Sequence, residues 1–597
     1  MTLVSLLRLL VIAVNMTADS KKHHFFSAPP FRKDMPRLSR TPLSAGKGET
    51  GQIPHGALRA IGEAVRSEGV GGTFWEKPSR RHFKVILTVP DNINISVIRR
   101  VLLSLNERVD RADILLVVPS RSARLLRVAR TLGLSHAPAG KQDPHSLMPG
   151  LDEIIAIEPD ACQYDLCILA AIHDKPVHIW HRKNPEPQRL TRVQALETLY
   201  DEVEYICPFS GRLMSCLEAV KLLVFWKEII QSNRRIGAVM GMSLWKRPQI
   251  RRFLSHAPGS PPISSSARSV IRQCTLSRQD QVAIWATRLP DTIRGALEDA
   301  GLHVVLVEDG FVRSVGLGSA LQPPASIFLD TRGVYYDPSQ ASDLEHILAN
   351  ARFDPELMSR ARLIIRRLRT RGISKYAHQR PVASTAPQKR SRLRILVPGQ
   401  VADDLSVLRG GGEIKDNLAL LRAVRAARPD AHIIYRPHPD VEGGYRKGML
   451  PDAIVLGFAD EISRGGNIIE CMTQVDELHT MTSLAGFEAL VREIPVTTYG
   501  VPFYAGWGLT QDMGVIPKRR GRKLSIEELV AGTLLLYPRY LDPKTHLPCA
   551  LEILLDRFDD PDLWRPTVWM HLRRLQIAAL KRAALLFATL SRSTRFS

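Results

Sequence analysis

The sequence has no apolar run of the roughly 18 residues that a membrane-spanning helix needs. Its seven cysteines form no C-x-x-C pair and no Cys/His cluster at zinc spacing. A polytopic membrane protein and a disulfide-stapled fold are therefore excluded, no metal site is expected, and a reducing compartment is favoured. With 44% hydrophobic and 24% charged residues, the 597-residue chain has the composition of a globular protein with several domains.

Acidic residues are scarce at the two ends of the chain. Residues 1–80 contain 12 Lys and Arg against 6 acids, and residues 565–597 contain 7 Lys and Arg and no acid. These ends hold about 13 of the 22 excess positive charges, which favours contact with an anionic surface over a basic groove through the core. Because no RNA- or DNA-binding motif accompanies the charge, nucleic acid is not an expected partner.

The first 80 residues are expected to form a basic, largely disordered N-terminal region, because residues 20–80 are rich in Pro, Ser, Gly, Lys and Arg. Residues 3–14 form a short apolar run that contains Arg8. We interpret this run as an interfacial anchor, or as sequence upstream of the true start. A secretory signal is the alternative, although no A-x-A-like cleavage site follows.

From residue 83 onward, strand-like and helix-like patterns alternate. FKVILTVP, SVIRRVLLSL, ADILLVVP and ARLLRVARTLG follow one another in this order, and IIAI, CILAAI and PVHIW continue the alternation. Such alternation predicts a parallel sheet with helices on its faces. Residues 83–230 are therefore expected to form a Rossmann-like half-module.

Two further α/β blocks follow, at 236–370 and 393–557. IGAVMG, VAIWAT, HVVLVED and ASIFLD are the expected strands of the first block, and RILVPG, AHIIYRPHP, AIVLG, ELHTM and PVTTYG are those of the second. The polar segment 369–392 is expected to connect them. Two such halves enclose a cleft, and open α/β sheets bind ligands at the carboxyl ends of their strands.

The first block carries candidate catalytic carboxylates. In LVEDGFVRSVGLGS (306–319), Glu308 and Asp309 end a strand, and Arg313 and Ser314 are suited to an anionic ligand. The alternative is a solvated turn with an ordinary acidic pair. Further on, PPASIFLDTRGVYYD (323–337) predicts a strand that ends at Asp330.

The second block carries candidate nucleotide ligands. VPGQVADDLSVLRGGGE (397–413) contains a glycine run that suits phosphate, although it lacks the Walker pattern. In IIYRPHPD, Arg436 and His438 follow a strand, which is typical of a phosphate clamp. In TMTSLAGFEAL, Ser483 stands at a helix start and Glu488 lies one turn later. Each feature taken alone is also compatible with a plain loop, a structural His or simple helix capping.

Two aromatic residues, Tyr504 and Trp507, stand among glycines in GVPFYAGWGLTQD (500–512). Such aromatics line sugar sites or close cores. In their order along the chain, carboxylates in the first half and phosphate-binding patterns in the second predict a GT-B-like glycosyltransferase module.

Taken together, these motifs resemble the KpsC/LipA family of capsular polysaccharide biosynthesis proteins. The resemblance covers about residues 236–557 and also includes MGMSLWKR (240–247), ISKYA (373–377) and YLDPKTHLPC (540–549). Ala286 departs from the glycine that the family usually has after the tryptophan. The resemblance implies a retaining β-Kdo transferase that uses CMP-Kdo, needs no cofactor, and extends a short oligo-Kdo chain on a phosphatidylglycerol-type glycolipid.

The resemblance also implies roles for individual residues. Asp309 resembles the catalytic nucleophile, with Glu308 beside it. His438 and Ser483 resemble ligands of the CMP phosphate, and Glu488 a ligand of the cytidine or ribose. Substrate-binding roles are also expected for four further residues, Arg313, Gln400, Asp404 and Arg436.

The half-module at 83–230 resembles a degenerate copy of the nucleotide-binding half. ADILLVVPS (112–120) aligns with AHIIYRPHP (431–439), and YDLCILAAIHDKPVHIW (164–180) aligns with SLAGFEALVREIPVTTY (483–499). Val117, Pro119, Tyr164 and Leu169 then replace Arg436, His438, Ser483 and Glu488. YICPFSGRLMSCLE (205–218) echoes YLDPKTHLPCALE (540–552) with a two-residue slip. These losses predict one active module, and the alternative is a generic Rossmann resemblance.

Residues 565–597 are expected to form a basic amphipathic helix that lies on an anionic bilayer, or alternatively packs on the core. Together with the resemblance, this predicts a cytoplasmic protein, peripheral on the inner membrane of a Gram-negative bacterium. Other capsule biosynthesis or export proteins are a further expected class of partner. The competing functional hypothesis is a non-catalytic assembly, export or chain-length factor built on a retired transferase fold.

Overall fold

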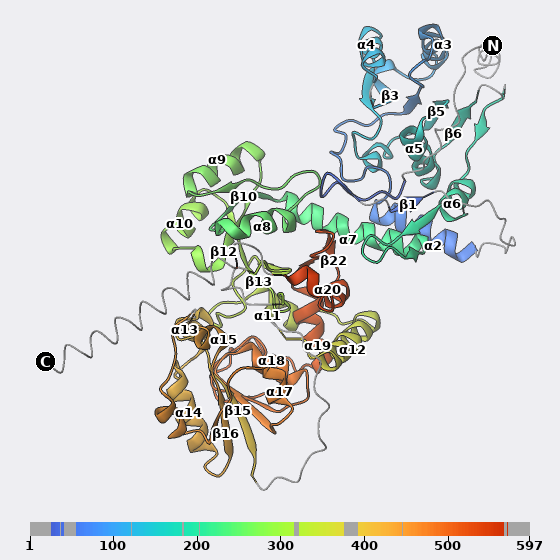
Figure 1. The fold of residues 1–597 in the computed structure, drawn as a ribbon. Coiled ribbons are helices and arrows are strands. Elements are labelled where there is room, and N and C mark those ends of the chain that lie inside the picture. The colour runs from blue at the N-terminus through green and yellow to red at the C-terminus, as the bar shows by residue number, and fades with distance from the viewer. Residues whose placement is uncertain are drawn as a thin grey trace. The chain divides into compact units, whose positions relative to one another are not determined.

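A computed structural model describes residues 25–35, 38–40, 55–120, 122–181, 184, 186–201, 203–315, 322–374, 392–444, 446–565 and 570. The chain forms two compact units (Figure 1). Unit 1 comprises residues 1–233 and 255–260, and unit 2 comprises residues 234–254 and 261–597. The predicted helix at 565–597 lies almost wholly outside the described residues, as do the apolar run at 3–14 and most of the connection at 375–391.

Unit 1 contains a six-stranded sheet in the order β4-β3-β2-β5-β6-β7. Its strands are β2 (Val85–Thr88), β3 (Ile114–Val118), β4 (Ser135–Pro138), β5 (Glu153–Ile157), β6 (Val177–Trp180) and β7 (Gln188–Arg189). All neighbours are parallel except β7, which pairs antiparallel with β6. Apolar residues of helices α3 (Ile95–Leu105) and α4 (Ala123–Thr131) pack on this sheet in one core.

The N-terminal region is more ordered than its composition predicts. Residues 55–68 form helix α2 (His55–Glu68), whose Leu58, Ile61 and Val65 are buried. Phe25 and Phe26 are also buried, each at 1% exposure. The expectation of disorder through residue 80 is therefore wrong for 25–35 and 55–80, because apolar residues at helical spacing let this polar segment bury one face.

The first half of unit 2 is built on a seven-stranded sheet in the order β11-β10-β12-β13-β14-β21-β22. Its first five strands are β10 (Ile236–Met240), β11 (Ile263–Ser264), β12 (Gln281–Trp285), β13 (His303–Asp309) and β14 (Ser326–Asp330). Strands β11, β10, β12 and β13 are parallel, whereas β14 runs antiparallel to β13. The helices of this half are α8 (Arg247–Phe253), α9 (Ala267–Ser277), α10 (Asp291–Asp299), α11 (Asp343–Asn350) and α12 (Pro355–Thr370).

The second half contains a parallel six-stranded sheet in the order β17-β16-β15-β18-β19-β20. Its strands are β15 (Arg394–Pro398), β16 (His432–Arg436), β17 (Glu461–Ile462), β18 (Glu477–Thr480), β19 (Val496–Thr498) and β20 (Gln511–Asp512). Its helices are α13 (Leu405–Gly410), α14 (Asn417–Ala427), α15 (Pro439–Glu442), α16 (Asp452–Leu456), α17 (Ile468–Met472) and α18 (Leu484–Leu490).

One predicted strand of this half is wrong. AIVLG lies in helix α16, which follows Pro451 and ends at Gly457. Only Val455 of this run is buried, whereas Ile454 and Leu456 are exposed. A short apolar run does not by itself separate strand from helix, and here the proline and the first-turn Asp452 favour the helix.

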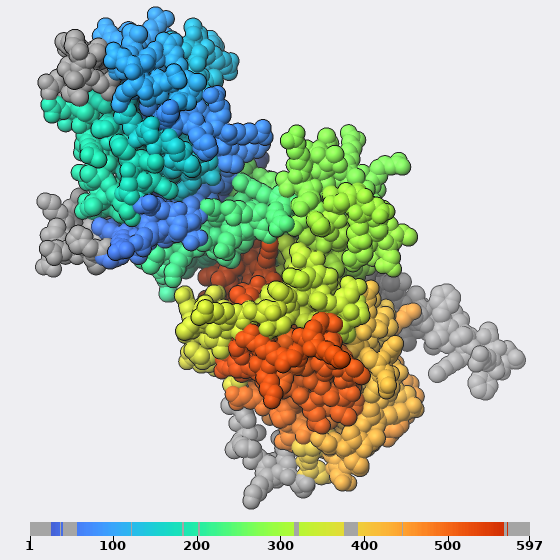
Figure 2. Space-filling view, turned by 180° about the vertical axis from the view of Figure 1, so that it is seen from behind, coloured from blue at the N-terminus to red at the C-terminus, as the bar shows by residue number. Residues whose placement is uncertain are grey.

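The chain returns from the second half to the first through helix α19 (Ile526–Val530) and the π-helical segment η7 (Ala531–Leu536). Strands β21 (Arg539–Leu541) and β22 (Pro548–Cys549) then complete the first sheet, and α20 (Leu551–Arg557) follows them. Helix α12 packs against α19, and α11 against η7. The space-filling view shows these yellow and orange-red segments in contact (Figure 2).

Unit 1 repeats the topology of the second half of unit 2. Strands β4-β3-β2-β5-β6 correspond in order and direction to β17-β16-β15-β18-β19. After α5 (Ala161–Ile172) and α18, the chain adopts a rare positive φ at Asp174 (58°) and at Glu493 (63°), which correspond in the two sheets. The shared positive φ therefore supports the alignment of residues 164–180 with residues 483–499, in which Leu169 stands at the position of Glu488.

The correspondence extends to the returning hairpin. Strands β8 (Glu204–Ile206) and β9 (Leu213–Met214) match β21 and β22, and the hydroxyls of Tyr205 and Tyr540 each donate to the carbonyl six residues upstream at 2.7 Å. Tyr205 pairs with Met214, and Tyr540 pairs with Cys549. The two hairpins therefore have equal length, and the two-residue slip expected from the sequence is wrong.

Unit 1 also contains counterparts of elements from the first half. Strand β1 (Ser39–Arg40) pairs antiparallel with β8 as β14 does with β21, with Ser39 opposite Tyr205 and Ser326 opposite Tyr540. Helix α2 is followed by Gly69 (φ 59°), and α12 by Gly372 (φ 58°). Unit 1 therefore matches the two-half module of unit 2, with a reduced first half.

Candidate functional site

A cleft of about 740 Å³ in unit 2 brings together residues from both halves. The first half contributes the ends of β12 and β13 and the loop after β14. The second half contributes the loops after β15 and β16 and the start of α18. Eight of the ten predicted site residues line this cleft, namely Glu308, Asp309, Gln400, Asp404, Arg436, His438, Ser483 and Glu488.

Asp309 ends β13, and its carboxylate is held by two cations. Lys246 Nζ lies 3.1 Å from Oδ1, and Arg313 Nε donates to Oδ2 at 2.8 Å. Both cations are buried, at 9% and 1% exposure. Two fixed positive charges favour the ionised carboxylate and restrict its rotation, which a carboxylate nucleophile requires.

Arg313 and Ser314 do not line the cleft. The Arg313 guanidinium donates to Asp309, to Ser314 Oγ and to the Gln322 carbonyl. Ser314 is fully buried. Burial directs the arginine onto the protein's own carboxylate, so the structure does not bring these two residues to the cleft lining with the other eight.

Lys246 was missed as a site residue, although its motif MGMSLWKR was recognised. It lies in η4 (Leu244–Lys246), with Nζ 3.5 Å from the centre of the Trp285 ring. Burial lowers the pKa of the Lys246 amino group, whereas Asp309 and Glu308 raise it. A lysine is usually exposed, so only the resemblance signals this residue in the sequence.

Glu308 lies beside Asp309, and its Oε1 accepts from the Asp309 backbone N–H at 3.1 Å. Successive side chains of a strand point to opposite faces, but at the strand end both carboxylates reach the cleft. Tyr335 and Tyr336 line the same wall.

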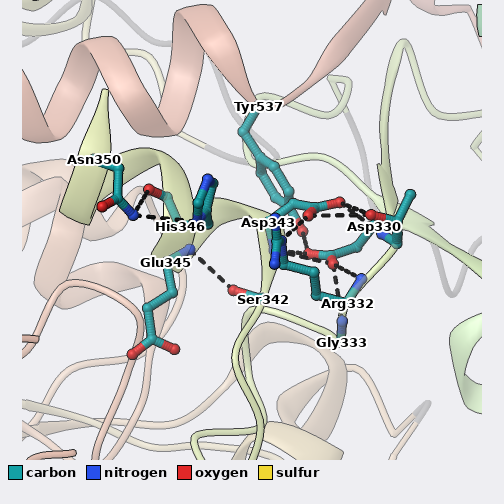
Figure 3. Close-up of polar contacts among 10 residues, drawn as sticks. Asp330, Arg332, Gly333, Ser342, Asp343, Glu345, His346, Asn350 and Tyr537 are labelled. Carbon is teal, nitrogen blue, oxygen red and sulfur yellow. Dashed lines mark hydrogen bonds and ion pairs between the residues drawn. The ribbon is translucent and has the colours of Figure 1, made fainter. Parts of the chain in front are cut away.

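A buried carboxylate, Asp330, orders the loop that carries these two tyrosines (Figure 3). Its Oδ1 accepts from the backbone N–H groups of Arg332, Gly333 and Asp343 at 3.0 Å each, and its Oδ2 accepts from the Tyr537 hydroxyl at 2.7 Å. Burial raises the pKa of Asp330. This carboxylate shapes the cleft wall without lining it.

In the second half, His438 and Ser483 each cap a helix at the cleft. His438 Nδ1 accepts from the Asp440 backbone N–H at 3.1 Å, so the proton of the neutral ring is on Nε2. Ser483 Oγ accepts from the Ala485 N–H at 3.2 Å. The fully buried Tyr504 donates to the Ser483 carbonyl and thereby fixes the start of α18.

Three other predicted ligands hold loops of the protein. Both terminal nitrogens of Arg436 are engaged, Nη1 with Ser463 and Cys471, and Nη2 with the carbonyls of Gly465 and Gly466. The Gln400 side chain bonds Thr480 and Thr482. Asp404 accepts from the N–H and hydroxyl of Ser406 as the cap of α13. These contacts identify all three as residues that shape the cleft.

The glycine run at 410–412 ends α13 and does not line the cleft. A Cβ on Gly500 would lie 2.4 Å from the Gly410 carbonyl oxygen, so these glycines permit close contact between two loops. The predicted phosphate role of the run is therefore wrong. Trp507, fully buried, likewise closes the core.

The corresponding region of unit 1 is organised differently. Helix α5 begins one turn earlier than α18, capped by Asp160, so that Tyr164 lies inside the helix where Ser483 caps α18. The fully buried Gln163 donates to the carbonyls of Val89 and Val117 at 3.0 Å each. A cavity of about 100 Å³ remains, lined by Val117, Asp165 and mainly apolar neighbours.

No three His, Cys, Asp or Glu side chains in the described part of the chain converge as metal ligands would. None of the described helices is both long and apolar enough to cross a bilayer.

Comparison with known proteins matches residues 280–365 and 356–540 to the family described as "Capsule polysaccharide biosynthesis protein". The capsule polysaccharide modification protein LipA of Neisseria meningitidis serogroup A is 41% identical over 345 residues, which cover 57% of this chain and 48% of LipA. The chain thus spans about half the length of the LipA proteins it matches.

The lipopolysaccharide-processing protein LpsZ of Rhizobium meliloti is 36% identical over 316 residues, which cover 52% of this chain and 70% of LpsZ. A solved structure described as "Thermosulfurimonas dismutans KpsC, beta Kdo 2,7 transferase" is 35% identical, covers 54% of this chain and 99% of its own, and has a TM-score of 0.45. The family match and the extent of these identities show that the chain belongs to the capsule polysaccharide biosynthesis proteins of the KpsC/LipA family.

Proposed function

We propose that unit 2 is a retaining glycosyltransferase that transfers Kdo from CMP-Kdo to a lipid-linked oligo-Kdo acceptor. One observation carries the proposal. The carboxylate of Asp309, fixed by Lys246 and Arg313, faces the same cleft as His438 and Ser483. This arrangement provides a nucleophile in one half and donors for a nucleotide phosphate in the other. The name given to the LipA relatives, capsule polysaccharide modification proteins, accords with such an activity.

In the first step, an Asp309 oxygen attacks the anomeric carbon of the donor sugar. The bond from that carbon to the CMP phosphate oxygen breaks, and CMP leaves with the electron pair. Lys246 and Arg313 then face an ester instead of a carboxylate anion. A phosphate leaving group needs no proton to depart, so the donors of the second half serve to bind its charge.

In the second step, a hydroxyl of the acceptor attacks the same carbon from the opposite face. The bond to Asp309 breaks, and the carboxylate returns to its two cations. Glu308 is the group placed to accept the hydroxyl proton. Two inversions at one carbon give net retention. The balance of atoms requires no cofactor.

We infer that unit 1 makes no glycosidic linkage. At the positions of Arg436, His438 and Glu488 it has Val117, Pro119 and Leu169, and Gln163 fills space at the start of its longer helix. Its cavity holds Asp165 and no cation, which disfavours an anionic nucleotide. Contact with other capsule proteins is the proposed remaining role.

The basic ends of the chain support a peripheral position on an anionic membrane. Residues 565–597 carry 7 Lys and Arg and no acid, and each basic residue contributes about 1 kcal/mol near such a surface. We propose that this places the enzyme at the cytoplasmic face of the inner membrane of a Gram-negative bacterium, where a phosphatidylglycerol-type acceptor lies.

The proposal is tested with the purified full chain, CMP-Kdo and a synthetic Kdo-lipid acceptor, with products read by mass spectrometry. Asp309→Asn should abolish transfer and leave CMP affinity within about twofold of wild type, because the nucleophile lies away from the nucleotide. His438→Ala should weaken CMP binding by about tenfold or more, as expected for a lost hydrogen bond to a charged group. Undiminished turnover of Asp309→Asn would contradict the assignment, and an inactive wild type would favour the non-catalytic alternative.

A further inference from the structure

Arg288 is an arginine of the cleft without a bonding partner among the described residues. It ends the short helix η5 (Ala286–Arg288), which follows β12 directly. Strand β12 pairs in parallel with β13, so the loop after β12 lies beside the strand end that carries Glu308 and Asp309. The cleft lining includes Arg288, and its side chain is exposed.

The backbone fixes where this side chain begins. Gly241 follows β10, the other neighbour of β12, with φ at 79°. A Cβ built on Gly241 would lie 3.0 Å from Arg288 Cβ and 3.4 Å from Trp285 Cβ. Residue 241 must therefore be glycine, and η5 lies closely against it at the carboxyl edge of the sheet.

The other arginines of the cleft are engaged with the protein. Arg436 bonds the loop at 463–466, and Arg446 pairs with Asp403 at 2.8 Å. Outside the lining, Lys246 and Arg313 are buried behind Asp309. Among the described residues that line the cleft, Arg288 is thus the arginine that a ligand can reach without breaking an existing ion pair.

The first half of the cleft presents two carboxylates to its ligand, which makes it a poor site for a second anion unless a cation is supplied. The proposed donor is a sugar acid whose carboxylate is bonded directly to the anomeric carbon. When Asp309 attacks that carbon, the two carboxylates approach each other closely. An arginine at this wall offers paired N–H donors that match carboxylate geometry.

We propose that Arg288 binds the carboxylate of a 2-ulosonic acid sugar in the cleft, beside Asp309. The inference rests on the proposed function, because it assigns the sugar acid a binding partner. Donor and acceptor are both sugar acids of this class, so either one can supply the carboxylate.

The test compares Arg288→Gln and Arg288→Lys with the wild-type full chain. The measurements are kcat and KM for CMP-Kdo and for a Kdo-lipid acceptor, with the affinity for CMP determined by calorimetry. Arg288→Gln should lower kcat/KM by about 10- to 100-fold, the effect of a lost charge-assisted bond, and Arg288→Lys should recover part of it. CMP has no sugar carboxylate, so its affinity should not change. The matched control is Arg272→Gln, an exposed arginine of α9 outside the cleft lining.

A loss confined to the donor KM assigns Arg288 to the donor carboxylate, and a loss confined to the acceptor KM assigns it to the acceptor. Unchanged kinetics of Arg288→Gln in an active enzyme would overturn the inference and leave the proposed function intact. A tenfold loss of CMP affinity would also overturn it, because the arginine would then serve the nucleotide. Absence of transfer by the wild type would remove the proposed function and the inference together.

Discussion

Asp309, the proposed nucleophile, illustrates how the identity of one residue and its surroundings combine to orient a carboxylate. A carboxylate at a strand end is common, and the sequence alone left a solvated turn open as an alternative. In the structure, Lys246 and Arg313 each contact one of its two carboxylate oxygens. Buried charges of opposite sign hold the anion in one orientation, at the cost of desolvating both cations.

We expect Lys246→Met to lower kcat by about 10- to 100-fold, because the proposed nucleophile Asp309 loses one of the two charges that orient it. CMP affinity should stay unchanged.

Lys246→Arg should restore part of the rate, and Lys415→Met, at an exposed lysine of the other half, should behave as wild type. A Lys246→Arg variant as slow as Lys246→Met would indicate that the charge of Lys246 does not orient Asp309.

At the residue scale, the sequence predicted the members of the site better than their roles. Spacing after strand ends placed eight residues in one cleft, because the carboxyl ends of parallel strands share an edge. It could not show that Arg313 is buried behind Asp309, or that Arg436 bonds loop carbonyls. The partners of these two arginines, such as Gln322 and Gly465, lie in loops further along the chain and leave no periodic pattern in the sequence.

Among the elements, the loop between β14 and α11 depends on one buried side chain. Asp330 accepts from three backbone N–H groups and one tyrosine hydroxyl. No single neutral side chain supplies as many acceptors at this position. The loop conformation, and with it the cleft wall formed by Tyr335 and Tyr336, therefore depends on Asp330.

Asp330→Asn should lower the free energy of unfolding by about 1–3 kcal/mol, because its amide turns a donor toward donors and leaves one of them buried without a partner. Tyr537→Phe, which removes one bond, should cost about 1 kcal/mol. Denaturant unfolding of both variants measures the difference, with Gln340→Ala at an exposed position of the same loop as the control. An Asn variant as stable as wild type would show that the loop does not need the charge.

Two elements of unit 1 meet through a pair of histidines. His145 of η3 (Pro144–Leu147) and His173 after α5 lie with ring centres 5.7 Å apart. Burial, together with nearby positive charges, lowers the pKa of His145 to about 3 and that of His173 to about 4. Both rings are neutral when the unit is folded at neutral pH, whereas in the unfolded chain they bind protons near pH 6.5.

The unfolded state therefore takes up more protons as pH falls below 6.5, and unit 1 should lose stability between about pH 6.5 and pH 4. Between pH 7 and pH 5, the free energy of unfolding of unit 1 should fall by about 1–2 kcal/mol less in His145→Phe than in the wild type. Hydrogen exchange of the α5 and β5 amides at pH 7 and pH 5 measures the stability of unit 1. The control is His303→Gln, at an exposed histidine. An unchanged pH dependence in His145→Phe would assign the acid sensitivity to other groups.

At the scale of elements, the strongly patterned strands were predictable and the short ones were not. Long β-branched runs such as HVVLVED and IIYR form β13 and the core of β16 as expected. The run AIVL forms a helix, and the true edge strand β17 is the two-residue Glu461–Ile462. An edge strand of two residues buries too little to leave an apolar pattern in the sequence.

Across the whole molecule, the chain contains one complete two-half α/β module, the proposed transferase, and one reduced module of the same topology. Contacts of β1 and β8 reproduce those of β14 and β21, which the sequence did not reveal because β1 is two residues long. The degenerate second half of unit 1 was recognisable from sequence, because its strands keep their order and spacing. A reduced module can lose its ligand-binding residues and still keep the core that stabilises it, since packing and binding depend on different residues.

This architecture predicts that the full chain makes one type of glycosidic linkage. The expected product of the purified protein, with CMP-Kdo and a Kdo-lipid acceptor, carries a single linkage type by NMR. Asp309→Asn in the full chain should then leave no transfer at all, because no second nucleophile acts. A matched change in unit 1, Gln163→Ala, should lower the free energy of unfolding by about 1–3 kcal/mol through two lost buried hydrogen bonds and leave the linkage and kcat unchanged.

If Asp309→Asn still formed one linkage, unit 1 would be catalytic despite its missing ligand-binding residues. If the wild type formed two alternating linkages and Asp309→Asn formed none, the single cleft of unit 2 would have to accept two acceptor hydroxyls.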